Sequence, residues 1–256
     1  MIKDLVLGFI RWPMWAVLAW EDICQRYRRN ILGPFWLTVS TGVSTSAMAL
    51  IFTKIFHIEN DIFIPYLTAG MIAWSFISSS VIESINVFIQ SKPIMMSIQL
   101  PLSFHVYRLV LKNFIIFLHI SVIYFLVTIF FPVELNVYTW MVIPGVIMNL
   151  VLFYFFAIPV GMVCARFRDV AQIIMSILAI CSYVTPLFWM PDMIGDNAWL
   201  LNYNPLYSCL VIIRDPLLGK MPTLFAYEVA GGLAFVLFLL SCFTYKKYMS
   251  RLIFWL

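Results

Sequence analysis

The sequence of 256 residues has few charged side chains, and this scarcity sets its class. Only 11% of the residues are Asp, Glu, Lys or Arg, whereas 63% are hydrophobic and the mean hydropathy is +0.97. Soluble domains hold about 25% charged and about 45–50% apolar residues, so a soluble globular domain is excluded. A disordered chain is excluded as well, because disorder needs low hydrophobicity and high charge. The composition predicts a polytopic membrane protein.

The sequence also lacks the groups that common enzymes use. It has no G-x-x-x-x-G-K-[ST] loop for nucleotide phosphates and no G-x-S-x-G nucleophile elbow. Its three histidines, His57, His105 and His119, are isolated from one another. The pair Asp192 and Asp196 lies beside Pro and Gly in MPDMIGD, which favours a solvated turn over a metal site. We therefore predict no catalytic residue, no metal site and no cofactor of the chain's own.

Cysteine spacing and net charge exclude further classes. No Cys-x-x-Cys occurs, which argues against a zinc knuckle or a thioredoxin-type pair, and no disulfide framework is expected. The formal net charge of +4 is too small to suggest a nucleic-acid partner. No cleavable signal peptide is visible at the N-terminus. The five cysteines are Cys24, Cys164, Cys181, Cys209 and Cys242.

Uncharged stretches predict the membrane spans. A spanning helix needs about 20 mostly apolar residues. Six stretches contain enough apolar residues for one span each. The stretch 197–213 is also short and contains a proline and several amides, which favours a re-entrant hairpin. We predict an all-α polytopic membrane protein with six transmembrane helices and an external re-entrant hairpin before the last one. The six stretches are 30–53, 62–82, 113–133, 135–165, 170–191 and 229–245.

The distribution of Lys and Arg predicts the orientation. With both termini in the cytoplasm, 13 of the 16 basic residues lie inside and only Lys54, Arg214 and Lys220 lie outside, as the positive-inside rule requires. If 197–213 also crossed the membrane, the tally would be 12 to 4, so charge alone does not exclude a seventh span. The inside residues are Lys3, Arg11, Arg26, Arg28, Arg29, Lys92, Arg108, Lys112, Arg166, Arg168, Lys246, Lys247 and Arg251.

The segment 12–30 differs from a span because it is amphipathic. Apolar residues recur at helical spacing from Trp12 and Trp15 to Ile23 and Tyr27, with charged residues elsewhere on the wheel. This pattern predicts an elbow helix lying along the cytoplasmic membrane surface. No repeat or linker divides the chain. We therefore predict one domain, 1–256, with an elbow region at 1–33, the bundle at 34–245 and a cytoplasmic tail at 246–256.

Aromatic residues, which make up 17% of the chain, suggest a substrate path. Most of them are explained by interfacial belts and by packing within spans. Several, however, lie beside serines and threonines, a mixture that suits a substrate that both stacks and hydrogen-bonds, as sugars do. Glu83, directly after the stretch 62–82, is the one acid read as lying inside a span, and its polar neighbours suggest a face turned toward other helices or a water-filled path. A proton or sodium relay, a helix-packing polar contact and a residue near the inner interface all stay open for it. The candidate path residues are Trp74, Phe76, Glu83, Tyr183, Phe188 and Trp189.

Four segments in order resemble a known family. They are RYRRNILGPFW at 26–36, ARFRDVAQI at 165–173, TPLFWMP at 185–191 and NPLYSCLVIIRDPLLG at 204–219. Together they resemble the membrane subunits of ABC exporters for polysaccharides, most closely those of the O-antigen branch. The resemblance extends along nearly the whole chain, to the tail YKKYMSRLIFWL.

This resemblance implies partners and further site residues. It implies a homodimer in the bacterial inner membrane, joined to two separate subunits that bind ATP and Mg, and a glycan cargo linked to undecaprenyl pyrophosphate. It places coupling to the ATPase in the loop 91–108 and the turn 166–169. The implied gate residues are Tyr203, Asn204, Pro205, Tyr207 and Arg214, and the implied coupling residues are Pro93, Pro101, Arg166, Arg168 and Asp169.

Three other functions stay open at this point. The chain could export a different cargo, such as a capsule polymer, a teichoic acid, a drug or a lipid. It could be a membrane glycosyl- or phosphotransferase, although the acidic cluster that such an enzyme needs is missing. It could also be a passive structural subunit.

Overall fold

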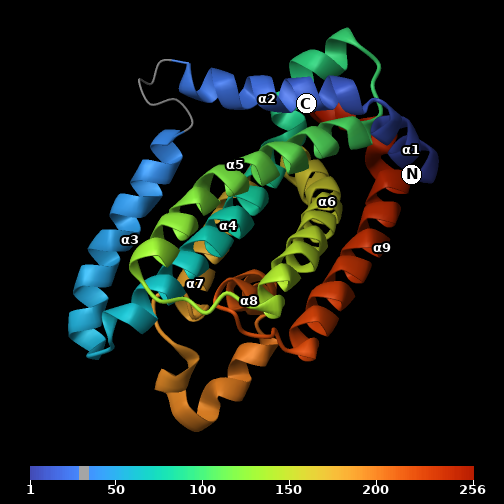
Figure 1. The fold of residues 1–256 in the computed structure, drawn as a ribbon. Helices are drawn as coiled ribbons and strands as arrows, with labels where there is room; N and C mark the ends of the chain where they lie inside the picture. Colours follow the sequence, from blue (N-terminus) through green and yellow to red (C-terminus); the bar gives the residue numbers. More distant parts are fainter. Residues whose placement is uncertain (29–34) are drawn as a thin grey trace.

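The computed structural model describes residues 1–28 and 35–256, and within these ranges all regular elements are helical (Figure 1). The part of the RYRRNILGPFW motif at 29–34, with the start of the predicted first span, lies outside the described residues. The elements are α1 (Ile2–Ile10), α2 (Trp12–Tyr27), α3 (Phe35–Phe56), α4 (Asn60–Ser97), α5 (Leu102–Phe130), η1 (Val137–Met141), α6 (Val142–Arg166), α7 (Arg168–Val184), η2 (Pro191–Tyr203), α8 (Pro205–Leu217) and α9 (Leu224–Trp255).

Five of the described helices are long and apolar enough to cross a membrane: α3, α4, α5, α6 with η1, and α9. The chain is therefore a multi-pass membrane protein. The predicted span 170–191 is shorter than expected, because α7 ends at Val184 after 17 residues. At 1.5 Å per residue it is about 26 Å long. Pro186 explains the end, since a proline disfavours helical backbone in the residue before it, and Thr185 is extended.

The bundle has two distinct ends (Figure 1). Helices α1 and α2, the C-terminal end of α9 and the α4–α5 connection lie at one end, which we call the termini end. The elements η1, η2 and α8 lie at the opposite end, which we call the hairpin end. Helix α4 packs against α5, α6 and α8, and α9 packs along α6. Both chain ends therefore lie at the same end of the bundle, as the sequence predicts.

Small residues allow the closest helix contacts of the core. A Cβ atom added to Gly145 of α6 would lie 2.0 Å from the carbonyl oxygen of Ile212 in α8. One added to Gly161 would lie 2.6 Å from Cγ1 of Val87 in α4. Close backbone approach through small residues is typical of membrane bundles, in which apolar burial from water does not drive helix association. The glycines of α6 therefore set the packing of α4 and α8.

Helix α2 is amphipathic, and its apolar face packs on the protein. Ala19 and Ile23 are buried, and the ring of Trp15 stacks on Tyr107 of α5 at 5.5 Å between centroids. Trp12, predicted to share this face, is exposed instead, as is Trp20. The helix lies across the termini end of the bundle (Figure 1).

Helix α1 is held to the start of α5. The carboxylate of Asp4 accepts hydrogen bonds from the backbone N–H groups of Leu102 and Ser103, at 3.0 and 2.9 Å. These N–H groups have no partner within their own helix at its first turn, so Asp4 caps α5 from a distant part of the chain.

The predicted loop 91–108 is mostly helix. Helix α4 continues to Ser97 with Pro93 inside it, and α5 begins at Leu102 after Pro101. Only four residues, 98–101, connect the two. With 38 residues, α4 is about 57 Å long and exceeds the hydrocarbon thickness of about 30 Å, so one end projects beyond it.

Candidate functional site

A buried arginine organises the hairpin end. Arg214 of α8 is 2% exposed, and its Nη1 donates to the hydroxyl of Tyr66 and to the carbonyl oxygen of Pro186, both at 2.8 Å. Its Nε lies 3.2 Å from Oδ1 of Asp215. Its guanidinium also lies 4.5 Å from the ring centroid of Tyr66 and 5.8 Å from that of Tyr207. The charge of this buried arginine is thus compensated by one carboxylate, two rings and two oxygens.

The segment 185–190 is fastened to α4 and α8 by this cluster. The hydroxyl of Tyr66 lies 3.0 Å from the carbonyl oxygens of both Pro186 and Trp189. Asn204 donates from Nδ2 to Oγ1 of the buried Thr185 at 2.9 Å. We call Tyr66, Arg214 and the carbonyl of Pro186 the hairpin lock. Two motifs that lie apart in the sequence, TPLFWMP and NPLYSCLVIIRDPLLG, therefore meet here.

The predicted gate residues have different surroundings. Asn204 caps α8, because its Oδ1 accepts from the N–H groups of the next turn, and Pro205 is the first residue of that helix. Tyr207 is partly buried against the core. Tyr203 is 77% exposed. Sequence reasoning missed Tyr66, whose only sequence signal was a polar group within an apolar span.

Three of the predicted path residues lie close together at the end of α7 and directly after it. The rings of Tyr183 and Phe188 are 6.4 Å apart between centroids, and Trp189 donates from Nε1 to the backbone oxygen of Tyr183 at 3.2 Å. Phe188 also stacks on Phe52 of α3 at 6.2 Å. Tyr183 is 73% exposed. These aromatic residues form a cluster between α7 and α3 that opens to the surface.

The two aromatic path residues of α4 lie in the core or at its edge. Phe76 is 2% exposed and packs between Phe117 of α5 and Phe153 of α6, at 5.0 and 6.0 Å. A ring enclosed in this way has no surface to offer a substrate. Trp74 is partly buried against the same core.

Glu83 forms ion pairs with two other helices. Its Oε1 lies 2.6 Å from Nη2 of Arg26 in α2, and its Oε2 lies 2.6 Å from Nζ of Lys112 in α5. The side chain of Lys112 is 8% exposed and that of Glu83 is 10% exposed. A third ion pair joins Arg108 of α5 to Asp22 of α2. Glu83 therefore links α4 to α2 and α5.

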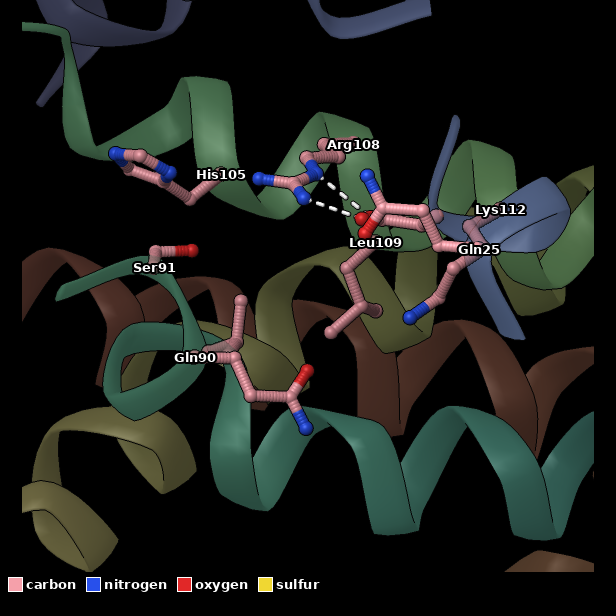
Figure 2. A pocket seen from close by; sticks show the side chains of 9 residues that line it. Gln25, Gln90, Ser91, His105, Arg108, Leu109 and Lys112 are labelled. Atoms are coloured by element: carbon pink, nitrogen blue, oxygen red, sulfur yellow. Dashed lines mark hydrogen bonds and ion pairs between the residues drawn. The ribbon is translucent and has the colours of Figure 1, made fainter. Parts of the chain in front are cut away.

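A polar cavity of about 240 Å³ lies beside these ion pairs (Figure 2). It is bounded by α2, α4 and α5 at the termini end. Sequence reasoning missed it, because its lining comes from three separate segments. The lining residues are Asp22, Gln25, Val87, Gln90, Ser91, His105, Arg108, Leu109 and Lys112.

The predicted coupling residues all lie at the termini end. Pro93, Arg168 and Asp169 are exposed, and Pro101 is half-buried at the start of α5. The guanidinium of Arg166 lies between two rings, 4.9 Å from the centroid of Phe167 and 5.1 Å from that of Trp255. The C-terminal tail is thereby fixed to the turn between α6 and α7, and Lys92 of α4 donates to the carbonyl oxygen of Leu256.

Metal chemistry finds no support in the described part of the chain. Within residues 1–28 and 35–256, no three His, Cys, Asp or Glu side chains lie close enough together to hold a metal ion. Asp192 and Asp196 are both exposed in η2. The five cysteines are free thiols.

Within the described residues, helices of membrane-spanning length form a bundle with η1, η2 and α8 at one end and both chain ends at the other (Figure 1). The model of the family described as ABC-2 type transporter matches residues 14–218. The chain therefore belongs to the ABC-2 type transporter family. This confirms the resemblance predicted from the four segments.

Two curated relatives carry a more specific name. Both are O-antigen export system permease proteins RfbA from Klebsiella pneumoniae, and each is 24% identical to this chain over 212 residues. The matched region covers 82% of this chain and 81% of each relative. The similarity therefore spans most of both proteins and is not confined to one motif.

Proposed function

We propose that the chain is the membrane permease subunit of an ATP-driven exporter that moves a lipid-linked, O-antigen-like polysaccharide out of the cytoplasm. The observation on which this proposal mainly rests is the similarity over most of the chain to permeases named for O-antigen export. The family match over 14–218 supports the same role. ATP and Mg belong, in this proposal, to two separate ATPase subunits.

A face of α7 that carries three polar side chains supports a path between two copies of the chain. Gln172, Ser176, Ala179 and Tyr183 follow one another at three- and four-residue intervals, and all four are exposed. Residues at this spacing lie on one face of a helix. Polar side chains facing lipid are unfavourable, which favours a protein or water-filled neighbour for this face. We therefore propose a homodimer in which this face and the cluster of Tyr183, Phe188 and Trp189 line the path.

The remaining path candidates are assigned from their surroundings. Trp74 stays in the proposed path as a residue at its edge, since it is only partly buried. Phe76 and Glu83 are left out, because one is enclosed in the core and the other is held in ion pairs. A polymer has to slide, so several weak stacking contacts suit it better than one tight site.

The proposed topology has six spans, with α7 as the fifth and with both termini in the cytoplasm of a bacterial inner membrane. Helix α8 with η2 forms the external re-entrant hairpin, and α2 is the cytoplasmic elbow. The exposed coupling residues at the termini end would then meet the ATPase subunits. Single cysteines at Asp61, Asn136 and Asp196 should react with an impermeant thiol reagent added outside, and those at Lys92 and Lys247 should not. Outside labelling at Lys247 would refute this orientation.

The function itself is tested by export of surface glycan in a strain whose own copy of the gene is deleted. The wild-type chain, expressed with its partner ATPase, should restore the glycan. The variant Tyr183→Ala should lower export while the amount of folded protein stays unchanged, because Tyr183 is exposed. The matched control is Phe76→Ala. Truncating this buried ring costs about 3–5 kcal/mol and should lower the amount of folded protein instead.

The outcomes separate the alternatives. Failure of the wild-type chain to restore glycan would refute polysaccharide export and revive a different cargo. Normal export by Tyr183→Ala would refute the path while leaving the proposed cargo in place.

A further inference from the structure

The lining of the polar cavity under α2 contains more cationic hydrogen-bond donors than its single carboxylate can pair with. Its charged lining is Arg108, Lys112 and Asp22, so cations exceed anions by one. Including Glu83, which pairs with Lys112, and Arg26, which pairs with Glu83, leaves the excess at one positive charge. Arg108 donates hydrogen bonds from Nε and Nη2 to the carboxylate of Asp22, and its remaining nitrogen, Nη1, is directed toward His105 (Figure 2).

His105 is the most unusual member of the lining. It is 1% exposed, and neither of its ring nitrogens has a hydrogen-bond partner among the described residues. A buried polar group without a partner is costly, and few such groups persist in folded proteins without a reason. Beside it, on α4, the hydroxyl of Ser91 faces the same cavity (Figure 2). An occupant that hydrogen-bonds would satisfy the imidazole.

The cavity has the size and the position for a lipid headgroup. A single water needs only about 10–15 Å³ of such space, so 240 Å³ leaves room for a polyatomic group. The helix above it, α2, exposes Trp12 and Trp20, and tryptophans of this kind sit at the level of the headgroups. The cavity therefore lies at the depth of the membrane interface, next to an amphipathic helix.

We propose that this cavity binds the phosphate or diphosphate group of a lipid at the cytoplasmic surface, with Arg108 and Lys112 supplying charge and Ser91, Gln90 and His105 supplying hydrogen bonds. Guanidinium and ammonium groups make strong, charge-assisted hydrogen bonds to phosphate oxygens. The inference rests on the proposed function only for the identity of the lipid, which would be the diphosphate carrier of the glycan. The charge and the shape of the cavity do not depend on it.

The test measures binding of a fluorescent farnesyl diphosphate to the permease in complex with its ATPase, in nanodiscs of phosphatidylcholine. Ser91→Asp places a carboxylate in the cavity and should weaken binding by about tenfold or more, the loss of one charge-assisted hydrogen bond. Ser97→Asp, on the exposed last turn of the same helix, is the matched control and should bind as the wild type does. Asp22→Asn releases Arg108 from its ion pair and should tighten binding.

Opposite effects of the two variants are the signature of an anion site. A purely structural ion pair predicts instead that Asp22→Asn lowers only the amount of folded protein. If Ser91→Asp and Asp22→Asn both bind farnesyl diphosphate with the affinity of the wild type, the proposal is overturned. Competition experiments identify the source of the phosphate. Competition by phosphatidylglycerol indicates a bulk lipid, and competition by neither phosphatidylglycerol nor inorganic pyrophosphate indicates the diphosphate carrier. Competition by inorganic pyrophosphate indicates a free anion as the preferred ligand, which would also overturn the proposal.

Failure of this inference differs from failure of the proposed function. Normal glycan export together with no cavity-dependent binding refutes the lipid site alone. Cavity-dependent binding without glycan export by the wild type refutes the cargo and leaves the anion site standing.

Discussion

Replacing Arg214 with methionine should release the segment 185–190 from the bundle. Methionine keeps much of the apolar stem but removes the two 2.8 Å hydrogen bonds and the charge over the ring of Tyr66. A hydrogen bond to a charged group contributes about 1.5–3 kcal/mol. Breaking a buried charged network by removing one member costs about 3–5 kcal/mol. We therefore expect Arg214→Met to lower the free energy of unfolding by about 3 kcal/mol.

The assay for this prediction has two measurements. Equilibrium unfolding in mixed detergent micelles gives the change in stability. The second measurement is the reactivity of Leu187→Cys toward an impermeant thiol reagent, compared with protein that lacks the added cysteine. Leu187 is 1% exposed, so its replacement should be unreactive in the intact lock and reactive when Arg214 is methionine.

Two control variants make the test specific. Arg214→Lys keeps the charge but loses the planar fork, so its effect should lie between wild type and methionine. Tyr66→Phe removes the hydroxyl that lies 3.0 Å from the carbonyl oxygens of Pro186 and Trp189. If Arg214→Met unfolds within 1 kcal/mol of the wild type, roughly the level of an ordinary hydrogen bond, and Leu187→Cys stays protected, then Arg214 does not hold this segment.

Two predictions concern packing inside the bundle. Glu83→Gln leaves Lys112 buried without its counter-charge and should destabilise the protein by about 3 kcal/mol. Adding Lys112→Met should restore most of that stability in the same unfolding assay. A double variant as unstable as Glu83→Gln alone would show that the ion pair is not the cause. Gly145→Ala should lower the amount of folded protein, because its Cβ would lie 2.0 Å from a backbone oxygen. Gly232→Ala is the control and should be tolerated, because a Cβ there meets nothing within 4 Å. Equal amounts of folded protein for the two variants would contradict this account.

Side-chain direction limited the prediction of the site from sequence. Trp74 and Phe76 both lie near serines, and the local pattern does not distinguish a ring in the core from one at its edge. Tertiary packing placed Phe76 between Phe117 and Phe153. Tyr183, Phe188 and Trp189 are three of the six predicted path residues. They lie together because they are close in the chain and the extended backbone at Thr185 turns it after α7. Whether they contact a substrate stays a prediction.

The ends of the helices also differ in whether the local sequence or the tertiary packing sets them. The start of α5 after Pro101 follows from local chemistry, because proline cannot donate a helical hydrogen bond and suits a helix start. The continuation of α4 through Pro93 does not follow from it, since a proline usually marks a break. Near the end of a long helix that already packs on its neighbours, the lost hydrogen bond is a small part of the total, so the helix persists to Ser97.

The sequence by itself determined that this protein is a helical membrane protein, because composition and long uncharged runs leave the backbone no other way to satisfy its hydrogen bonds in lipid. The four motifs, and not the composition, carry the resemblance to polysaccharide exporters, and the match over residues 14–218 shows the ABC-2 type transporter family. Only the tertiary structure decided the partners of the buried charges. Arg214 meets Tyr66 across 148 positions in the chain, and Glu83 meets Arg26 and Lys112 from two other helices. Such pairs leave no periodic signal in a single sequence. They form because a charge buried in the bundle is stable only where distant segments bring its counterparts within hydrogen-bond distance.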